Sequence, residues 1–345
     1  MHTIIPLEGR SPETFPLDPL LTPPARACRF PHILSNQGSG VVVQVGTDVK
    51  TLKPGDAVYG LAFAHGTFPL LAPGFAAEYA VVSARLLLRK PDHLSFEEAA
   101  CVAASAVTCY QCVRRYFELT DQSLDATLEG KTVFIPGALS ATGNVYIQMA
   151  KNCYGAGKVI STVSTPKVKL LKEEEGEYHD RVGKFLDQVV DYKTQDVVRK
   201  VGKGTVDFVL NTQWQFTSTF PLLNRRTGAA VSIASVPSAA TVQKMFGREN
   251  VPFWVVWVLN LVYLWYDYWK LRGTNIRQDF VSGNPGNRED LEKVGEWIAQ
   301  EKIRPIVTIV EMEDLDEVRR LCGMVASGKG GVGQLVVRIK RDGRD

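Results

Sequence analysis

The stretch VFIPGALSATGNVYIQMAK, residues 133–151, reads as an apolar strand, a turn of small residues and a helix. The turn runs from Gly137 to Gly143 with the pattern GxxSxxG. Small residues let a backbone approach a pyrophosphate closely, and the N–H groups at a helix amino terminus favour negative charge. This context predicts a phosphate site for a dinucleotide, and the alternative is a tight connection that binds no ligand.

The segments around this turn continue the alternation of strands and helices. Apolar strands are expected at KTVFIPG, KVISTV, QVVDY, TVDFVLN and AAVSIAS. Alternation of this kind indicates βαβ units and a parallel sheet that is covered on both faces. Further along, REDLEKVGEWIAQ and LDEVRRLCGMVAS are expected to be helices, and IRPIVTIV and GQLVVRI to be strands.

The amino-terminal part has a different texture. Residues 1–31 are rich in proline without a sustained hydrophobic period, which predicts an extended arm. Short β-branched segments broken by glycine follow, and they indicate a small β-rich unit. A helix is then expected from SFEEAAC onward, where Ser95 and Glu98 have the spacing of a capping box.

The end of the second strand favours one nicotinamide cofactor over the other. An acidic residue commonly holds the ribose hydroxyls of NAD at this position. Here Ser164, Thr165 and Lys167 supply hydroxyls and a cation, and the segment VISTVSTPKVK contains no carboxylate. We therefore predict NADPH, because a cation pairs with the 2′-phosphate. Alternatively, Lys167 is a solvated lysine at a helix start.

Composition excludes several other functions. Forty basic and 37 acidic residues give a net charge of +3 without a dense basic patch, so no nucleic-acid partner is expected. No targeting signal is visible, which predicts a cytoplasmic location. Cys109 and Cys112 form a CxxC within the expected helix, but no second pair completes a zinc site. We expect two packed cysteines and predict no bound metal.

Several segments, in their order, resemble a known family. They are HILSNQGSGVVVQVGTDVKTLKPGDAVYG, FAAEYAVVSARLLLRKPDHLSFEEAACVAASAVTCY, SATG, LDQVVDYKTQD and KGGVGQLVVRI. The set resembles the medium-chain dehydrogenase/reductase superfamily, in particular its zinc-free quinone oxidoreductase and enoyl reductase branch of fungal type. The resemblance implies an α/β fold in which a GroES-like β-barrel catalytic domain, shortened at its amino terminus, accompanies a Rossmann domain with a doubly wound parallel sheet.

The same resemblance implies a domain organisation and a set of cofactor-binding residues. After the arm 1–31, residues 32–125 and 290–345 would form the catalytic domain, and 126–289 the Rossmann domain with a helical insertion at 251–269. The pyrophosphate would lie at Gly137, Ser140, Ala141, Thr142 and Gly143. Ser164 and Lys167 would contact the 2′-phosphate, and Tyr192 the adenosine. Thr108 would approach the nicotinamide in a cleft that Asn211 and Ser235 also line.

Departures from the family pattern bear on the chemistry. Ser35-Asn36-Gln37 stands where zinc-dependent members carry Gly-His-Glu, and the four-cysteine lobe is absent, so both metal sites are expected to be lost. Fewer residues precede this block than in relatives, and the missing part usually floors the substrate site. An activated C=C, as in an α,β-unsaturated carbonyl, or a quinone is then a more suitable hydride acceptor than a simple ketone.

These features predict an NADPH-dependent oxidoreductase, with a place in secondary metabolism. The alternative is a non-redox descendant that binds, cyclises or rearranges a hydrophobic intermediate. His65, in a glycine-rich loop, is the first candidate proton donor because histidine titrates near neutral pH, unless it is an incidental loop residue. Asn36 and Tyr110 are further candidates, and each has the alternative of being satisfied inside the fold.

The segment VPFWVVWVLNLVYLWYDYW, residues 251–269, holds four of the six tryptophans. Its length approaches that of a membrane span, but the later segments must rejoin the first domain, so we do not expect it to cross a bilayer. Three alternatives remain open. The segment is a buried core or homodimer helix, a peripheral membrane contact, or a pocket wall for a bulky apolar substrate formed by Trp254, Trp257 and Trp265.

Overall fold

The computed structural model describes residues 2–4, 33–62, 74–172, 176–213, 216–265, 268–269, 271–284, 286–328 and 331–339. The chain divides into two compact units. Unit 1 comprises Met1–Val107 and Asn284–Asp345, and unit 2 comprises Thr108–Gly283. The observed boundary falls inside helix α2 (Phe96–Leu119), whereas the sequence analysis placed it after residue 125. A continuous helix carries no compositional signal of a boundary, which explains the difference.

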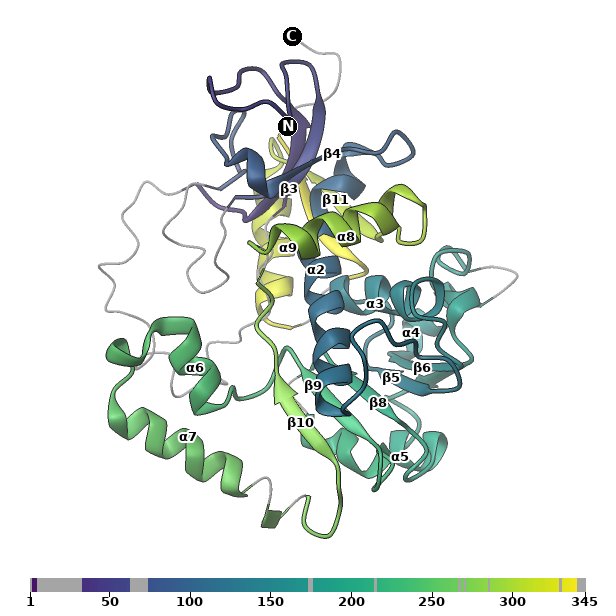
Figure 1. The fold of residues 1–345 in the computed structure, drawn as a ribbon. Coiled ribbons are helices and arrows are strands. Elements are labelled where there is room, and N and C mark those ends of the chain that lie inside the picture. Colours follow the sequence, from purple (N-terminus) through teal and green to yellow (C-terminus); the bar gives the residue numbers. More distant parts are fainter. Residues whose placement is uncertain are drawn as a thin grey trace. The chain divides into compact units, whose positions relative to one another are not determined.

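Unit 2 contains one parallel six-stranded sheet, ordered β10-β9-β8-β5-β6-β7. Its strands are β5 (Thr132–Ile135), β6 (Lys158–Val163), β7 (Gln188–Asp191), β8 (Phe208–Asn211), β9 (Ala229–Ser232) and β10 (Arg277–Phe280). The chain builds outward from β5 to β7, returns to β8 beside β5, and builds toward the other edge (Figure 1). This order confirms the Rossmann sheet and places its switch point between β5 and β8. Strand β10 was not expected, because RQDF has no apolar run; it lies at an edge.

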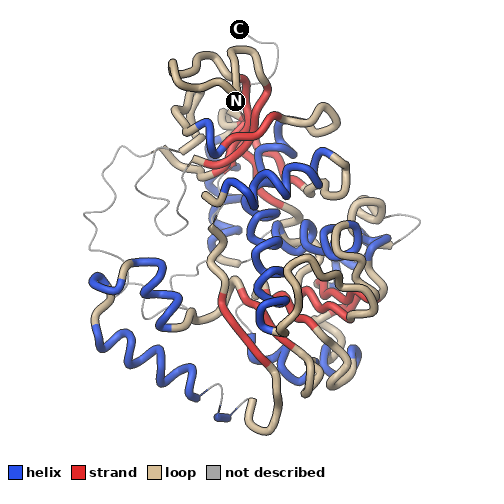
Figure 2. Tube along the Cα trace, viewed as in Figure 1, coloured by secondary structure: helices blue, strands red, loops and turns tan. Residues whose placement is uncertain are grey.

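Helices of unit 2 follow most strands (Figures 1 and 2). The α-helices are α3 (Ala141–Asn152), α4 (Thr165–Val168), α5 (Val197–Val201), α6 (Ala239–Phe246) and α7 (Phe253–Trp265). The 3-10 helices are η2 (Lys169–Leu171), η3 (Gly183–Phe185), η4 (Phe216–Leu222) and η5 (Arg248–Asn250). Helix α3 contacts β5 and β6, and α6 contacts α7. The core gathers apolar side chains of the strands and η4, including Phe134, Val209 and Phe220.

Unit 1 contains a second six-stranded sheet, ordered β11-β12-β1-β2-β3-β4. Its strands are β1 (His2–Ile4), β2 (Gln37–Val41), β3 (Ala57–Leu61), β4 (Leu87–Arg89), β11 (Val307–Glu311) and β12 (Gln334–Arg338), and its helices η1 (Ala84–Leu86), α8 (Arg288–Ala299) and α9 (Leu315–Ala326). Strand β1 lies within the part predicted to be an extended arm. It pairs antiparallel with both β12 and β2, and such long-range pairing leaves no local periodicity to detect.

Polar contacts within unit 1 stabilise the amino terminus of α2. The Ser95 amide donates to the Glu98 carboxylate and the Glu98 amide donates to Ser95 Oγ, each at 3.1 Å, so the expected capping box is confirmed. Glu98 also pairs with Arg304 (2.8 Å), and Glu97 pairs with Arg338 of β12 (2.7 Å). These contacts fix the start of the helix to the sheet of unit 1.

Candidate functional site

The small-residue turn lies where the sequence placed it, between β5 and α3 in unit 2. Gly137 adopts a left-handed φ of 79°, which favours glycine. A Cβ at Gly143 would lie 2.2 Å from the Gly137 carbonyl oxygen and 2.7 Å from Ser140 Oγ, so only glycine fits there without movement. The turn therefore brings the helix start against the strand end, in the arrangement that a pyrophosphate site needs.

Most backbone amides of this turn already have partners. The Gly137 amide donates to Thr162 Oγ1 (3.1 Å), and the Ala138 amide donates to the Thr162 carbonyl (2.9 Å). Ser140 caps α3, with its Oγ accepting the Gly143 amide at 3.0 Å.

Of the five residues predicted at the pyrophosphate, this leaves two with amides for an anion. Ala141 and Thr142 occupy the first turn of α3, where no carbonyl of a preceding turn is available to their amides. Ser140 therefore shapes the site, while Ala141 and Thr142 offer the N–H groups.

A second group of predicted residues lies at the neighbouring strand ends. Ser164 is the N-cap residue of α4, and Lys167 is half-buried within that helix. Burial lowers the pKa of Lys167, because desolvation disfavours its charged form. The Tyr192 amide donates to the Val163 carbonyl (3.1 Å), which holds the end of β7 beside the end of β6. The structure thus brings the segments that carry Ser164, Lys167 and Tyr192 together at the carboxyl ends of the neighbouring strands β6 and β7.

This edge also holds a carboxylate that the sequence analysis missed. Asp191, the last residue of β7, accepts a hydrogen bond from Thr165 Oγ1 at 2.7 Å and another from the Lys193 amide at 3.0 Å. The hydrogen bond from Thr165 is the largest cause of a lowered Asp191 pKa. The VISTVSTPKVK segment has no acid of its own, but the adjacent strand supplies one. In the sequence, DYK (residues 191–193) places a carboxylate at a strand end, but only the strand order shows that this carboxylate lies beside Thr165.

Two buried polar atoms lie at the carboxyl ends of β8 and β9, one on the last residue of β8 and one three residues after β9. Asn211 is fully buried, and its Nδ2 donates to Ser232 Oγ at 2.9 Å. Its Oδ1 has no hydrogen-bond partner in the part of the chain that the structure describes, and neither does the Oγ of Ser235, which is 7% exposed. Buried polar atoms normally have partners, so a ligand that both donates and accepts would complete this region. A nicotinamide carboxamide has that chemistry.

The remaining site predictions fall in different parts of the chain. Thr108 belongs to unit 2, and a Cβ at Gly283 would lie 2.3 Å from its Oγ1. Tyr110 is half-buried, with the Arg114 guanidinium 5.6 Å from its ring centre. Asn36 belongs to unit 1, and its Oδ1 is buried without a partner among the described residues. His65 lies outside the described residues.

The two cysteines of the CxxC are packed as expected. Both are fully buried in α2, and the Cys109 thiol donates to the Thr142 carbonyl at 3.8 Å. Burial raises the pKa of both thiols, so they stay protonated at neutral pH. The contact with Thr142 places α2 against the start of α3.

The three tryptophans of the predicted substrate pocket lie on the outer face of α7. Trp254, Trp257 and Trp265 are 37%, 64% and 49% exposed. Their role in a pocket stays a prediction. Within the described residues, no helix combines the length and the apolar character needed to cross a membrane.

Comparison with known proteins agrees with both units. Residues 20–92 match the family model described as "Alcohol dehydrogenase GroES-like domain", and residues 186–329 match the one described as "Zinc-binding dehydrogenase". Both matches agree with the resemblance to the medium-chain dehydrogenase/reductase superfamily. A solved quinone oxidoreductase from Coxiella burnetii has the same fold, with a TM-score of 0.62 and 22% identity over 90% of this chain and 81% of that one.

Curated relatives match over shorter stretches. A 2-methylene-furan-3-one reductase of Solanum lycopersicum is 37% identical over 143 residues, which is 41% of this chain and 34% of the relative. An NADPH-dependent alkenal/one oxidoreductase of Arabidopsis thaliana is 35% identical over 145 residues, 41% of this chain and 35% of the relative. The matched part thus spans about a third of each relative's length.

One of the two matching family models is described as "Zinc-binding dehydrogenase", so the presence or absence of metal ligands bears on the chemistry. The described residues contain no group of three or more His, Cys, Asp or Glu side chains that could hold a metal ion. At the position of the superfamily's Gly-His-Glu, Gln37 Oε1 instead accepts the Ala104 amide at 2.8 Å. The absence of a metal stays a prediction.

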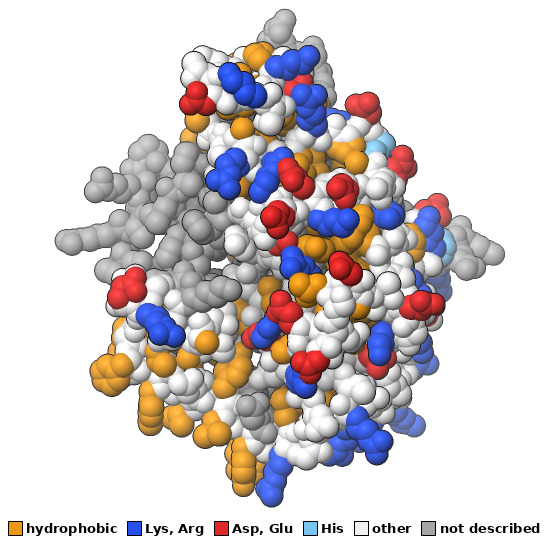
Figure 3. Space-filling view, in the orientation of Figure 1, with side chains coloured by type: hydrophobic (Ala, Val, Ile, Leu, Met, Phe, Trp, Pro, Cys, Tyr) orange, Lys and Arg blue, Asp and Glu red, His pale blue; other side chains and the backbone are white. Residues whose placement is uncertain are grey.

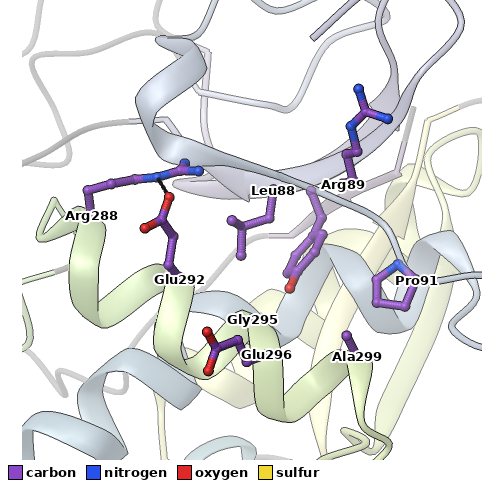
Figure 4. Close-up of a pocket in the computed structure, with 9 residues that line it drawn as sticks. Leu88, Arg89, Pro91, Arg288, Glu292, Gly295, Glu296 and Ala299 are labelled. Atoms are coloured by element: carbon purple, nitrogen blue, oxygen red, sulfur yellow. Dashed lines mark hydrogen bonds and ion pairs between the residues drawn. The ribbon is translucent and has the colours of Figure 1, made fainter. Parts of the chain in front are cut away.

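A cavity of about 400 Å³ in unit 1 is separate from these predicted residues. It is lined by Tyr59, Leu88, Arg89, Pro91, Arg288, Glu292, Gly295, Glu296 and Ala299. Figure 4 shows Leu88 pointing from β4 toward α8, and Arg288 paired with Glu292 (2.7 Å). Arg288 also donates to the Leu87 carbonyl at 2.8 Å, so its charge holds α8 against β4. The residues around the cavity thus hold α8 against β4, and we assign them a structural role.

Proposed function

We propose that the protein is an NADPH-dependent, zinc-independent reductase of an activated C=C bond or a quinone in a bulky apolar substrate. The carboxyl edge of the unit 2 sheet carries this proposal, because it combines the anion-accepting start of α3 with two buried polar atoms that have no hydrogen-bond partner among the described residues. The printed names of the two curated relatives, a furanone reductase and an alkenal/one oxidoreductase, support the same chemistry. The sequence prediction of a cytoplasmic location stays a prediction.

The chain's own residues would orient the cofactor, which supplies the hydride when bound. Amides of Ala141 and Thr142, aided by the α3 dipole, would hold the pyrophosphate. Lys167 and Ser164 would hold the 2′-phosphate. Asn211 Oδ1 would accept from the carboxamide N–H and Ser235 would donate to its oxygen, which fixes the face of the ring turned toward the substrate.

A proton must reach the enolate or phenolate that hydride transfer creates. Tyr110, two residues after Thr108 on α2, is the candidate donor among the described residues of unit 2. A Tyr110→Phe variant should keep NADPH affinity and lower kcat by roughly a hundredfold, the usual contribution of a general acid. An unchanged kcat would transfer this role to His65.

Cofactor binding is the first test. Titration should show quenching of protein fluorescence by NADPH, with clear preference over NADH. Lys167→Ala should weaken NADPH binding by about ten- to a hundredfold and leave NADH binding nearly unchanged, because only NADPH carries the 2′-phosphate. Lys169→Ala, an exposed lysine two residues away, is the matched control. Absence of NADPH binding to the full chain would sink the proposal.

Turnover is the second test. Consumption of NADPH should be followed with a small enone, a bulky aryl enone and a quinone. The bulky apolar acceptor should have the lowest KM, and Trp265→Ala tests whether an α7 tryptophan contributes to that preference. Conversion that proceeds equally without NADPH contradicts a reductase and favours a non-redox descendant.

A further inference from the structure

Apart from the exposed Asn260, helix α7 consists of apolar and aromatic residues, and the described residues cover only one of its sides. Val255 and Leu259 are fully buried, and Tyr263 donates to the Val236 carbonyl at 3.1 Å. The opposite side carries exposed large side chains, from 37% exposure at Trp254 to 86% at Phe253. We call these residues the aromatic stripe: Phe253, Trp254, Trp257, Leu261, Leu264 and Trp265.

The aromatic stripe is continuous and large. At the helical rotation of about 100° per residue, its members fall within an arc of roughly 120°. They extend about 18 Å along the helix, and Figure 3 shows hydrophobic side chains gathered along the lower left edge, over α7. The exposed area is on the order of 800 Å², above the largest apolar patch of a typical monomer. A helix with this composition requires a partner for its outer face.

The chemistry of the aromatic stripe and its ends suits a lipid headgroup region. Between Phe253 and Trp265 there is no charged residue. Exposed arginines lie at both ends: Arg248 precedes the helix, and the Arg272 guanidinium lies 5.4 Å from the Tyr268 ring centre. Tryptophan and tyrosine prefer membrane interfaces, where the rings enter the apolar layer and the polar tips stay hydrated. Arginines beside them pair with anionic lipid phosphates.

A second copy of the chain fits the same face less well. Two-fold antiparallel association of two α7 helices would bring the end with Arg248 and Glu249 of one copy to the end with Arg272 of the other, so the charges at the helix ends do not select such a pair. Side chains as exposed as Phe253 (86%) and Trp257 (64%) would each need a matching recess on a second copy. A fluid lipid layer takes up such side chains without a matching pocket.

We propose that α7 docks the protein on an anionic membrane surface, lying in the plane of the interface. The aromatic stripe enters the boundary between headgroups and acyl chains, and Arg248 and Arg272 lie at the phosphate level. This docking goes beyond the proposed reductase activity and does not depend on it, since none of the phosphate-turn residues takes part.

Vesicle co-sedimentation of the full chain tests this docking. Vesicles of phosphatidylcholine are compared with vesicles that also contain phosphatidylserine. The variant Phe253→Ser/Leu261→Ser/Leu264→Ser should lower the partition coefficient by at least about tenfold, because each change removes a side chain that enters the apolar layer. The matched control, Tyr79→Ser/Val81→Ser, alters side chains of unit 1 that are 70% and 92% exposed, and it should bind as the wild type does.

Two further measurements test the contribution of arginine charge and the insertion depth of the tryptophans. Arg272→Gln should lower binding to phosphatidylserine vesicles about fivefold and leave binding to phosphatidylcholine unchanged. Tryptophan fluorescence of the wild type should be quenched by vesicles of shallowly brominated lipids, a measurement that needs no variant.

Several outcomes would overturn the docking. They are failure of the wild type to bind either vesicle, equal binding by the stripe variant, and an unquenched wild type. Sedimentation velocity separates the rival partner: a wild-type dimer that the stripe variant converts to monomer, without vesicle binding, assigns the face to a second copy. NADPH titration of the same samples reports on the proposed function separately, so either can fail alone.

Discussion

Two regions of unit 2 differ in opposite ways from an ordinary folded surface and core: one has buried polar atoms and the other has exposed apolar side chains. At the carboxyl ends of β8 and β9, Asn211 Oδ1 and Ser235 Oγ are buried, and the described residues offer them no hydrogen-bond partner. On α7, Trp257 and Leu264 are 64% and 63% exposed. Folding normally pairs buried polar atoms and covers apolar surface. The first region therefore calls for a small polar ligand and the second for an apolar surface, although only α6 and η5 lie between Ser235 and α7 along the chain.

The polar region depends on close backbone approach at the phosphate turn, and Gly143→Ala should break it. The added Cβ would meet the Gly137 carbonyl oxygen at 2.2 Å, so we expect a loss of at least about 4 kcal/mol in unfolding free energy, together with lost NADPH binding. Chemical denaturation and NADPH titration measure the two effects.

Gly323→Ala is the matched control, because it is also a glycine inside a helix. Its Cβ would meet nothing within 4 Å, so the change should stabilise the protein by about 0.5–1 kcal/mol. Equal effects of the two substitutions would show that the close approach at Gly143 is not what shapes the turn.

The apolar region has a covered and an uncovered side, and the same substitution on each side separates them. Leu259→Ala should cost about 3 kcal/mol in unfolding free energy, because the side chain is fully buried. Leu264→Ala, on the same helix but 63% exposed, should change it by less than about 0.5 kcal/mol. Similar losses at both positions would mean that the outer face is covered within the protein itself.

The same contrast explains what the sequence could predict. Strands with apolar runs, such as β5 and β8, and the turn ending at Gly143 were found, because each has a local pattern. Strand β1 was missed because its pairing with β2 and β12 joins distant segments, and β10 because an edge strand needs few apolar residues. Helix α7 was recognised, and the pocket alternative named Trp254, Trp257 and Trp265 of its exposed side, but a helix with mostly apolar residues does not reveal which side the protein covers.

The candidate site residues divide in the same way, into those with a local sequence pattern and those that depend on distant pairing. Ser140 and Lys167 belong to segments with a readable order of strand, turn and helix, so they could be chosen from the sequence. Asp191 could not, because it approaches Thr165 only through the pairing of β6 with β7. A residue that acts across neighbouring strands is visible only after the strand order is known.

Ser235 gives a sharper test of the polar region, because two measurements should change in opposite directions. Its hydroxyl is buried without a partner among the described residues, so Ser235→Ala should leave unfolding free energy unchanged or raise it by up to about 1 kcal/mol. The affinity for NADPH should fall about five- to tenfold, since a hydrogen bond to the cofactor is lost. Lower stability with unchanged affinity would assign the hydroxyl to the fold.

The smallest expected effect concerns Asp191 and pH. Its pKa is lowered chiefly by the hydrogen bond from Thr165, so the ionised form stabilises the folded state above the unfolded-state pKa of about 4. This contribution is lost as pH falls through that value toward the lower pKa of the folded state. Asp191→Asn should therefore be less stable than wild type at pH 7, and the difference should shrink below about pH 4.

Urea unfolding of both proteins between pH 7 and pH 3 measures this convergence. Thr165→Val removes the main donor and should reduce the same pH dependence, which ties the effect to this pair. A pH-independent difference between Asp191→Asn and wild type would mean that the carboxylate acts through shape and not charge. Since Asp191 lies beside the segment that carries Lys167, its neutralisation should also raise the preference for NADPH over NADH, because one negative charge near the 2′-phosphate is removed.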